Sequence, residues 1–216
     1  MSKQEVQSKE EQYFEWWLQE LQDNGYINNF AKAKTYELIT EVKNYYIEYL
    51  KTKEKEKTQM IENSHSYTPD YEIHWNIKAK DIFAQTFIYP SEYYKEKTIK
   101  LDNNCFWQVK GTKCLVEVKG GFSLHGQLRN NSVDRKLMLE KHSIYVNLVK
   151  IPDLFKTTFT PQKYLLTDTG KQNRIIHFKI KSLQEFEMSN VLCLSRAMRE
   201  EANWLKNSID LTLKTI

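Results

Sequence analysis

The sequence is poor in residues that interrupt regular structure, with only 6 Gly and 4 Pro among its 216 residues. Low-complexity and disordered chains are usually rich in them, so we expect a folded body, and 13 Tyr, 10 Phe and 5 Trp supply aromatic side chains for its core. A chain of this length can bury one proper hydrophobic core but not two large ones. We therefore expect one domain with appendages.

Cysteines and long apolar runs are also scarce. The three cysteines, Cys105, Cys114 and Cys193, include no CxxC pair, which fits neither a disulfide framework nor a zinc site, so we expect them to be reduced and structural. No run approaches the roughly 18 apolar residues of a membrane span, and the polar, acidic N-terminus is unlike a signal peptide. The sequence predicts a soluble protein of the cytoplasm.

Positive charge is present only in modest excess, at a formal net charge of +4. Such a balance permits nucleic-acid binding but does not predict it alone, because nucleic-acid-binding domains usually carry a strongly basic patch. Residues 51–57 alternate Lys with Glu or Thr. This run is typical of a solvated hairpin tip or loop, and a loop that touches phosphate is the alternative.

A helix is predicted near the N-terminus. Ser8 and Glu11 have the spacing of a capping box, and apolar residues then recur at helical intervals until residues 23–25 end the helix; these are Phe14, Trp17, Leu18 and Leu21. Glu10 and Glu11 lie within or beside this apolar stripe. Acids so close to a buried face are candidates for a function beyond capping.

Several strands are predicted between residues 35 and 109. Apolar spacing over residues 35–50 fits a helix, whereas the aromatic and β-branched content favours strands, which we expect. Pro69 cannot donate to a ladder, so it should open a strand with Asp70 among the first residues. Residues 76–104 read as an excursion from the core, with a strand at 82–89 and a polar loop at 91–100.

The most informative stretch is Val116-Glu117-Val118-Lys119-Gly120-Gly121. Side chains alternate faces along a strand, so Val116 and Val118 point to one face while Glu117 and Lys119 point to the other. Residues 106–109 and 114–118 are expected to form a β-hairpin that contains this stretch. A surface ion pair on a strand face is the alternative for Glu117 and Lys119, as a simple turn residue is for Asp70.

A helix over residues 127–142 and a strand over 144–149 should follow, giving a strand–helix–strand unit. One face of the helix offers the core Leu128, Val133, Leu137 and Met138, and the other carries Arg129, Arg135, Lys136 and Lys141. The basic face either binds phosphate or is an ordinary solvated face. The first domain should end at residue 150, and 151–216 should add a β-hairpin turning near 168–171 and a helix over 189–207.

The expected order of elements resembles the PD-(D/E)xK nuclease superfamily over residues 8–150, through Pro69-Asp70 and Glu117-Val118-Lys119. The segments YTPDY and VEVKG resemble those of phage endonucleases of the Holliday-junction-resolvase-like or transposon-end-nuclease-like kind. The resemblance implies an α/β fold, with a mixed sheet flanked by helices in a restriction-endonuclease-like αβββαβ core. It also implies a phage or mobile-element protein acting in a bacterial cell.

Residue by residue, the resemblance implies that Asp70 and Glu117 are metal ligands, with the backbone carbonyl of Val118 as a further ligand. Lys119 would position the attacking water and offset charge on the phosphate. Glu11 would be the family's upstream acid, which Glu10 or Glu15 could supply instead. The basic helix would contact DNA through Arg129, Arg135, Lys136 and Lys141.

Elementary chemistry agrees with magnesium as the cofactor. Mg²⁺ is a hard cation that prefers carboxylate oxygens and keeps bound waters, and it both polarises phosphoryl oxygens and acidifies a bound water. Mn²⁺ should substitute for it. The expected function is Mg-dependent endonucleolytic hydrolysis of DNA, selective for branched or recombining phage DNA.

A non-catalytic nucleic-acid-binding or assembly protein that keeps the nuclease fold is the alternative. A homodimer, or a phage or mobile-element protein partner bound through residues 151–216, is a further expectation.

Overall fold

The computed structural model describes residues 8–86, 106–108, 112–120, 125–167 and 170–190, and the chain divides into two compact units, Met1–Ile151 and Pro152–Ile216. The first unit contains a four-stranded mixed sheet in the order β1-β6-β9-β10. Its strands are β1 (Ile27–Lys32), β6 (Tyr71–Trp75), β9 (Lys113–Lys119) and β10 (Val146–Lys150). β6 runs antiparallel to both β1 and β9, and β10 runs parallel to β9. The expected mixed α/β fold is confirmed.

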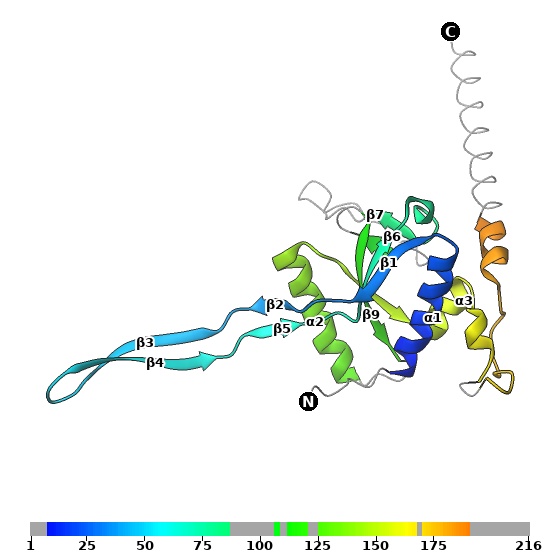
Figure 1. Ribbon diagram of the computed structural model, residues 1–216. Helices are drawn as coiled ribbons and strands as arrows, with labels where there is room; N and C mark the ends of the chain where they lie inside the picture. Colours follow the sequence, from blue (N-terminus) through cyan, green and yellow to red (C-terminus); the bar gives the residue numbers. More distant parts are fainter. Residues whose placement is uncertain (1–7, 87–105, 109–111, 121–124, 168–169, 191–216) are drawn as a thin grey trace, which may run out of the picture. The chain divides into compact units, whose positions relative to one another are not determined.

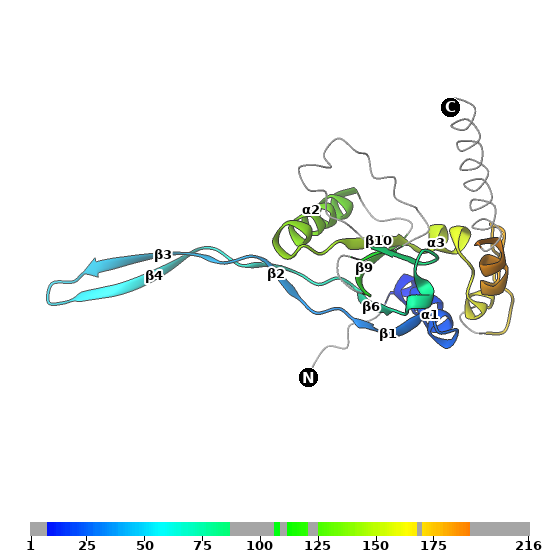
Figure 2. The same cartoon turned by 90° about the horizontal axis from the view of Figure 1, so that it is seen from above.

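Two helices cover opposite faces of this sheet (Figure 2). α1 (Lys9–Asp23) is capped by Ser8, whose hydroxyl accepts the Glu11 N–H as the capping box predicts. Its predicted stripe is buried in full, and Phe14 packs edge-on against Tyr71 of β6 at a ring-centroid distance of 5.4 Å. Gly25 follows with φ of 76°, the left-handed conformation that glycine favours after a helix.

α2 (His125–His142) connects β9 to β10 and confirms the expected strand–helix–strand unit. The core on its side of the sheet contains Tyr36, Leu38, Tyr67, Leu115, Met138 and Val146. Val133 was expected in this core but is half exposed. It lies two residues from the buried Asn131, about 200° around the helix, so it faces solvent. Leu128 has a side chain outside the described residues.

A long hairpin interrupts the chain between β1 and β6 (Figure 1). β2 (Tyr36–Ile39) pairs with β5 (His65–Tyr67), and β3 (Val42–Tyr49) pairs with β4 (Glu54–Glu62) beyond them. Strands over residues 35–50 are thus confirmed and the helical alternative is wrong. The tip of the hairpin takes residues 51–53 of the charged run, and the rest of that run lies on β4.

The hairpin expected between residues 106–109 and 114–118 is wrong. β8 (Phe106–Gln108) instead pairs in parallel with β7 (Ala84–Thr86). Both edges of β9 are already taken by β6 and β10, so β8 finds other partners. The side-chain amide of Asn147 in β10 donates to the Trp107 carbonyl oxygen and accepts from the Trp107 N–H, both at 2.8 Å.

The excursion expected over residues 76–104 is described only in part. A 3₁₀ turn, η1 (Ile77–Ala79), precedes β7, which is the described portion of the strand expected at 82–89. The polar loop expected at 91–100 lies outside the described residues. Of the cysteines, Cys114 is buried and free, whereas Cys105 and Cys193 also lie outside the described part.

The second unit is helical where a β-hairpin was expected. α3 (Ile151–Thr157) and η3 (Gln162–Leu165) occupy the place of its first strand, and an isolated bridge between Leu166 and Asn173 is the β-structure described. Pro152 and Asp153 suit the first turn of a helix, which explains the helix. The last described helix spans 183–190, is capped by Ser182 and begins earlier than expected; residues 191–207 lie outside the described part. No described helix has the length and apolarity needed to cross a membrane.

Candidate functional site

The two acids singled out by the motifs lie at adjoining ends of β6 and β9. Tyr71 is opposite Val116 in this antiparallel ladder, so continuing the register by one residue places Asp70 opposite Glu117. Asp70 directly precedes β6, and its Oδ2 accepts the backbone N–H of Val118 at 2.7 Å. Val118, expected to offer its carbonyl oxygen to a metal, thus offers its N–H to Asp70 here.

Glu117 is a buried carboxylate, only 6% exposed, with three donors around it. The Tyr67 hydroxyl donates to Oε2 at 2.8 Å, and the Asn131 amide donates to Oε1 at 2.9 Å. The Lys119 ammonium lies 2.5 Å from the same Oε1. A buried charge is tolerated when it is paired and hydrogen-bonded, so these contacts explain how the strand buries Glu117 and fix its orientation.

Burial and crowding of negative charge change the ionisation of this site. Burial, the Glu117 charge and, more weakly, the Glu11 charge raise the pKa of Asp70 to about 6, against a hydrogen bond from Val118 that lowers it. Burial and the neighbouring Glu117 also raise the pKa of the Tyr67 phenol, which therefore remains a hydrogen-bond donor. Asp70 thus ionises close to neutral pH, where a cation beside it would favour its charged form.

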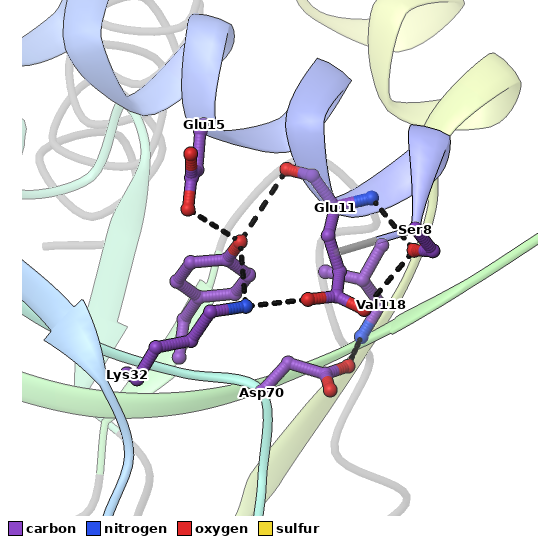
Figure 3. Close-up of polar contacts among 7 residues, drawn as sticks. Ser8, Glu11, Glu15, Lys32, Asp70 and Val118 are labelled. Atoms are coloured by element: carbon purple, nitrogen blue, oxygen red, sulfur yellow. Dashed lines mark hydrogen bonds and ion pairs between the residues drawn. The ribbon is translucent and has the colours of Figure 1, made fainter. Parts of the chain in front are cut away.

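Two of the three candidate acids of α1, Glu11 and Glu15, have different partners (Figure 3). Glu11 pairs with Lys32 and accepts a hydrogen bond from Ser8, and these contacts outweigh burial and lower its pKa. Glu15 accepts a hydrogen bond from the Tyr71 hydroxyl at 2.9 Å. The Glu11 charge also contributes to the raised pKa of Asp70, after burial and the Glu117 charge.

Glu10 approaches the end of β9 instead. A Cβ atom added to Gly120 would lie 3.2 Å from Glu10 Oε1, which is tighter than most such contacts. Glycine at this position therefore lets the Glu10 carboxylate approach the backbone directly after Lys119. α1 thus contributes two acids to the same end of the sheet.

The basic residues of α2 do not share one face. The Arg135 guanidinium donates to the Val146 carbonyl oxygen at 2.9 Å, so it turns toward β10. Lys136 is exposed, and the Lys141 ammonium lies 3.6 Å from Glu37. The side chain of Arg129 lies outside the described residues. Lys136 and Lys141 are the described members of this set that meet solvent.

Three residues of the site were missed from the sequence: Lys32, Tyr67 and Asn131. Asn131 lies seven residues before the buried Met138, so a polar residue on the apolar stripe was a usable signal. Tyr67 stands three residues before Asp70, within the motif itself. Lys32 had no local signal, because the pairing of β1 with β6 and the packing of α1 bring it to Glu11 and Tyr71.

The charge balance of the site suits a divalent cation. Four acids, Glu10, Glu11, Asp70 and Glu117, are accompanied by two lysines, Lys32 and Lys119. Within the described residues no three Asp, Glu, His or Cys side chains converge as a ready-made metal site. Mg²⁺ commonly takes one or two carboxylates and completes its shell with water and substrate oxygens. Asp70 and Glu117 fit that chemistry.

Comparison with known proteins adds no relative: no family model, curated protein or solved structure matches the chain.

Proposed function

We propose that this protein is a Mg-dependent endodeoxyribonuclease that hydrolyses DNA phosphodiesters, with branched or recombining phage DNA as its substrate class and Mn²⁺ as an effective substitute. The observation that carries the proposal is the meeting of Asp70 and Glu117 at adjoining strand ends, although 46 residues separate them in the chain. The order α1-β1-β6-β9-α2-β10 is also that of the αβββαβ core of the PD-(D/E)xK superfamily. The setting proposed is the cytoplasm of a bacterial host, with the protein encoded by a phage or mobile element.

The side chains have separate roles in this proposal. Asp70 and Glu117 would hold the cation, which when bound supplies polarisation of the phosphate and acidification of a water. Lys119 places a compact positive charge beside Glu117, where negative charge develops on the phosphate during attack. Tyr67 and Asn131 would orient Glu117 through the hydrogen bonds that they donate to it.

The proposed DNA path follows the solvent-facing cations of α2. Lys136 and Lys141 would contact the phosphate backbone, with Arg129 as a further contact. Arg135 is bound to the Val146 carbonyl oxygen, so its proposed contribution is to hold α2 against β10. Contacts of this kind position DNA without reading its sequence.

The test is a cleavage assay on four-way-junction and linear duplex DNA, with Mg²⁺, Mn²⁺ or chelator. Asp70→Ala and Lys119→Ala should each lower the cleavage rate by at least about 100-fold, as removal of one preorganised charged group often does. Glu72→Gln and Lys113→Ala are matched controls: these two residues of β6 and β9 form an ion pair of 2.6 Å with each other, and Lys113 begins β9 at the end opposite Lys119. These controls should keep wild-type rates.

Two results would count against the nuclease. Chelator-resistant cleavage would exclude the metal, and equal residual cleavage in wild type, Asp70→Ala and Lys119→Ala would show that a contaminant cuts the DNA. Preference for the junction over the linear duplex tests the substrate class separately.

A second candidate is a nuclease-fold protein that binds nucleic acid or assembles complexes without turnover. What favours it is Glu117, whose two oxygens are already occupied by Tyr67, Asn131 and Lys119. This candidate predicts DNA binding that falls steeply with salt, no heat of Mg²⁺ binding in calorimetry, and no cleavage under any metal condition.

A further inference from the structure

The hairpin formed by β3, β4 and residues 50–53 (Figure 1), here called the arm, exposes several apolar side chains. Tyr45 and Tyr49 are each 74% exposed. The other half-exposed apolar residues of the arm are Val42, Tyr46, Ile47, Leu50, Met60 and Ile61. Clustered exposed apolar side chains mark interaction surfaces, and a two-stranded hairpin alone is only marginally stable in water. The arm therefore has the character of a surface that meets a partner.

The two free edges of the arm differ in composition. β4 begins Glu-Lys-Glu-Lys, and such charges on an edge strand discourage pairing with another strand. β3 has two charged residues, Lys43 and Glu48, and they are paired with Glu41 and Lys57. Its remaining residues are Val, Asn, Tyr, Tyr, Ile and Tyr. The β3 edge is thus the one that lacks protection against strand addition.

Hydrogen bonding at the tip shows which groups that edge offers. The Leu50 N–H donates to the Lys53 carbonyl oxygen, so this pair is a hydrogen-bonded one. Hydrogen-bonded and non-hydrogen-bonded pairs alternate along an antiparallel ladder, so Tyr49, Ile47, Tyr45 and Lys43 belong to the second kind. Their backbone N–H and C=O groups point away from β4, toward the open edge.

We propose that β3 pairs antiparallel with β3 of a second copy of this chain, around a two-fold axis at Tyr46, so that the two arms form one four-stranded sheet. The register matches the outward groups, since Tyr45 then lies opposite Ile47 of the second copy and Lys43 opposite Tyr49. On the other face Asn44 lies opposite Glu48, and Tyr46 meets its own equivalent. No like charges face each other, and seven of the eight residues of β3, 43–49, pair with residues of β3 in the second copy.

DNA is a poorer occupant for the same surface. Residues opposite one another in a ladder share a face, so the face with Tyr49 and Ile47 also carries Glu54 and Glu56. These acids would repel phosphates. On the opposite face Glu48 neutralises Lys57. An unprotected β3 edge with a self-complementary register instead suits a second copy of the same strand.

The first test removes one outward N–H from each edge of the arm in the full-length chain. Ile47→Pro blocks the β3 edge, and Glu56→Pro blocks the β4 edge at the directly opposite residue. Sedimentation equilibrium over a range of concentrations should show a wild-type dimer. Ile47→Pro should raise the dimer dissociation constant at least about tenfold, since it removes interfacial hydrogen bonds, and Glu56→Pro should leave it unchanged.

The second test keeps the β3 backbone intact. Tyr46→Cys places two equivalent thiols at a non-hydrogen-bonded pair, where Cα atoms lie about 4.5 Å apart, so oxidised glutathione should link them into a covalent dimer. Lys57→Cys, opposite Tyr46 on β4, should not give that dimer, and nor should wild type. A wild-type monomer at all concentrations, a dimer unaffected by Ile47→Pro, or loss of DNA binding by Ile47→Pro in a monomeric chain would each overturn the proposal.

Discussion

β9 and β3 are strands of similar length that differ in burial. β9 has seven residues, and its five central ones are buried, including the charged Glu117. β3 has eight residues and leaves Tyr45, Ile47 and Tyr49 exposed. β9 has a strand on each edge and contacts α1 and α2, whereas β4 is the strand that β3 pairs with in the described part of the chain. Burial here is set by the neighbours that a strand acquires, more than by the apolarity of its own residues.

The largest expected effect comes from removing a buried side chain of the core beside β9, and it is compared with removal of an exposed side chain of the arm. Trp17 is fully buried, so Trp17→Ala should lower the free energy of unfolding by about 3–5 kcal/mol. Tyr45→Ala, at an exposed position, should change it by no more than about 0.5 kcal/mol. Urea unfolding of dilute, monomeric protein measures both. A cost for Tyr45→Ala equal to that of Trp17→Ala would break the comparison.

The next effect concerns Asp70. Its pKa is about 6 in the folded chain against 3.8 for a model carboxyl, because of burial and the Glu117 charge. The folded state therefore binds more protons between these values, and stability falls as pH rises from about 4 to about 6, by at most about 3 kcal/mol. Asp70→Asn should remove this loss, so in the absence of metal the variant should be more stable than wild type at pH 8 and similar at pH 4. Unfolding curves across this range decide it.

A smaller effect is expected for the hydrogen bond from Tyr67 to Glu117. Tyr67→Phe removes a buried donor to a carboxylate, which should cost about 2 kcal/mol of unfolding free energy. Tyr36→Phe is the matched control, since Tyr36 is the partner of Tyr67 in the β2–β5 ladder. In the nuclease assay Tyr67→Phe should lower the rate while Tyr36→Phe should not. Equal destabilisation by both variants would remove the special role of Tyr67.

The smallest effect concerns Glu11 and has the opposite sign to that of Asp70. Burial raises the pKa of Glu11, but hydrogen bonds from Lys32 and Ser8 together lower it by more than burial raises it. The pKa of Glu11 in the folded chain is therefore below the ordinary value. Its stabilising contribution is therefore present above the unfolded pKa and is lost as pH falls through the folded one. Since Lys32 is largely exposed, Glu11→Gln should cost less than about 1 kcal/mol at pH 7. A larger cost at pH 4 than at pH 7 would contradict this sign.

Local patterns in the sequence were sufficient for the elements they describe. The capping residue Ser8 and the apolar spacing of α1 predicted the helix and its buried face, and alternation along residues 116–119 predicted the strand. The acids of the candidate site came from the same kind of pattern. Their meeting did not, since it depends on a ladder between β6 and β9 across 46 residues.

Competition among distant segments explains part of what the expected fold got wrong. Residues 106–108 had the composition of a hairpin partner for β9, yet β6 and β10 had already filled both edges of that strand. Lys32 could not be assigned to the site before β1 was known to pair with β6. α3 is the exception, because Pro152 and Asp153 were local signals of a helix start that the apolar residues after them obscured.

The base of the hairpin has a consequence for how this chain could be altered. The Ala33 N–H donates to the Asp70 carbonyl oxygen at 3.4 Å, so the chain leaves the sheet and returns to it at neighbouring points. Ile39 and His65 face each other in the last pair of the β2–β5 ladder. A tight turn between them would excise residues 40–64 without changing the order of any strand in the four-stranded sheet. A chain shortened in this way would separate what the arm contributes from what the four-stranded sheet does alone.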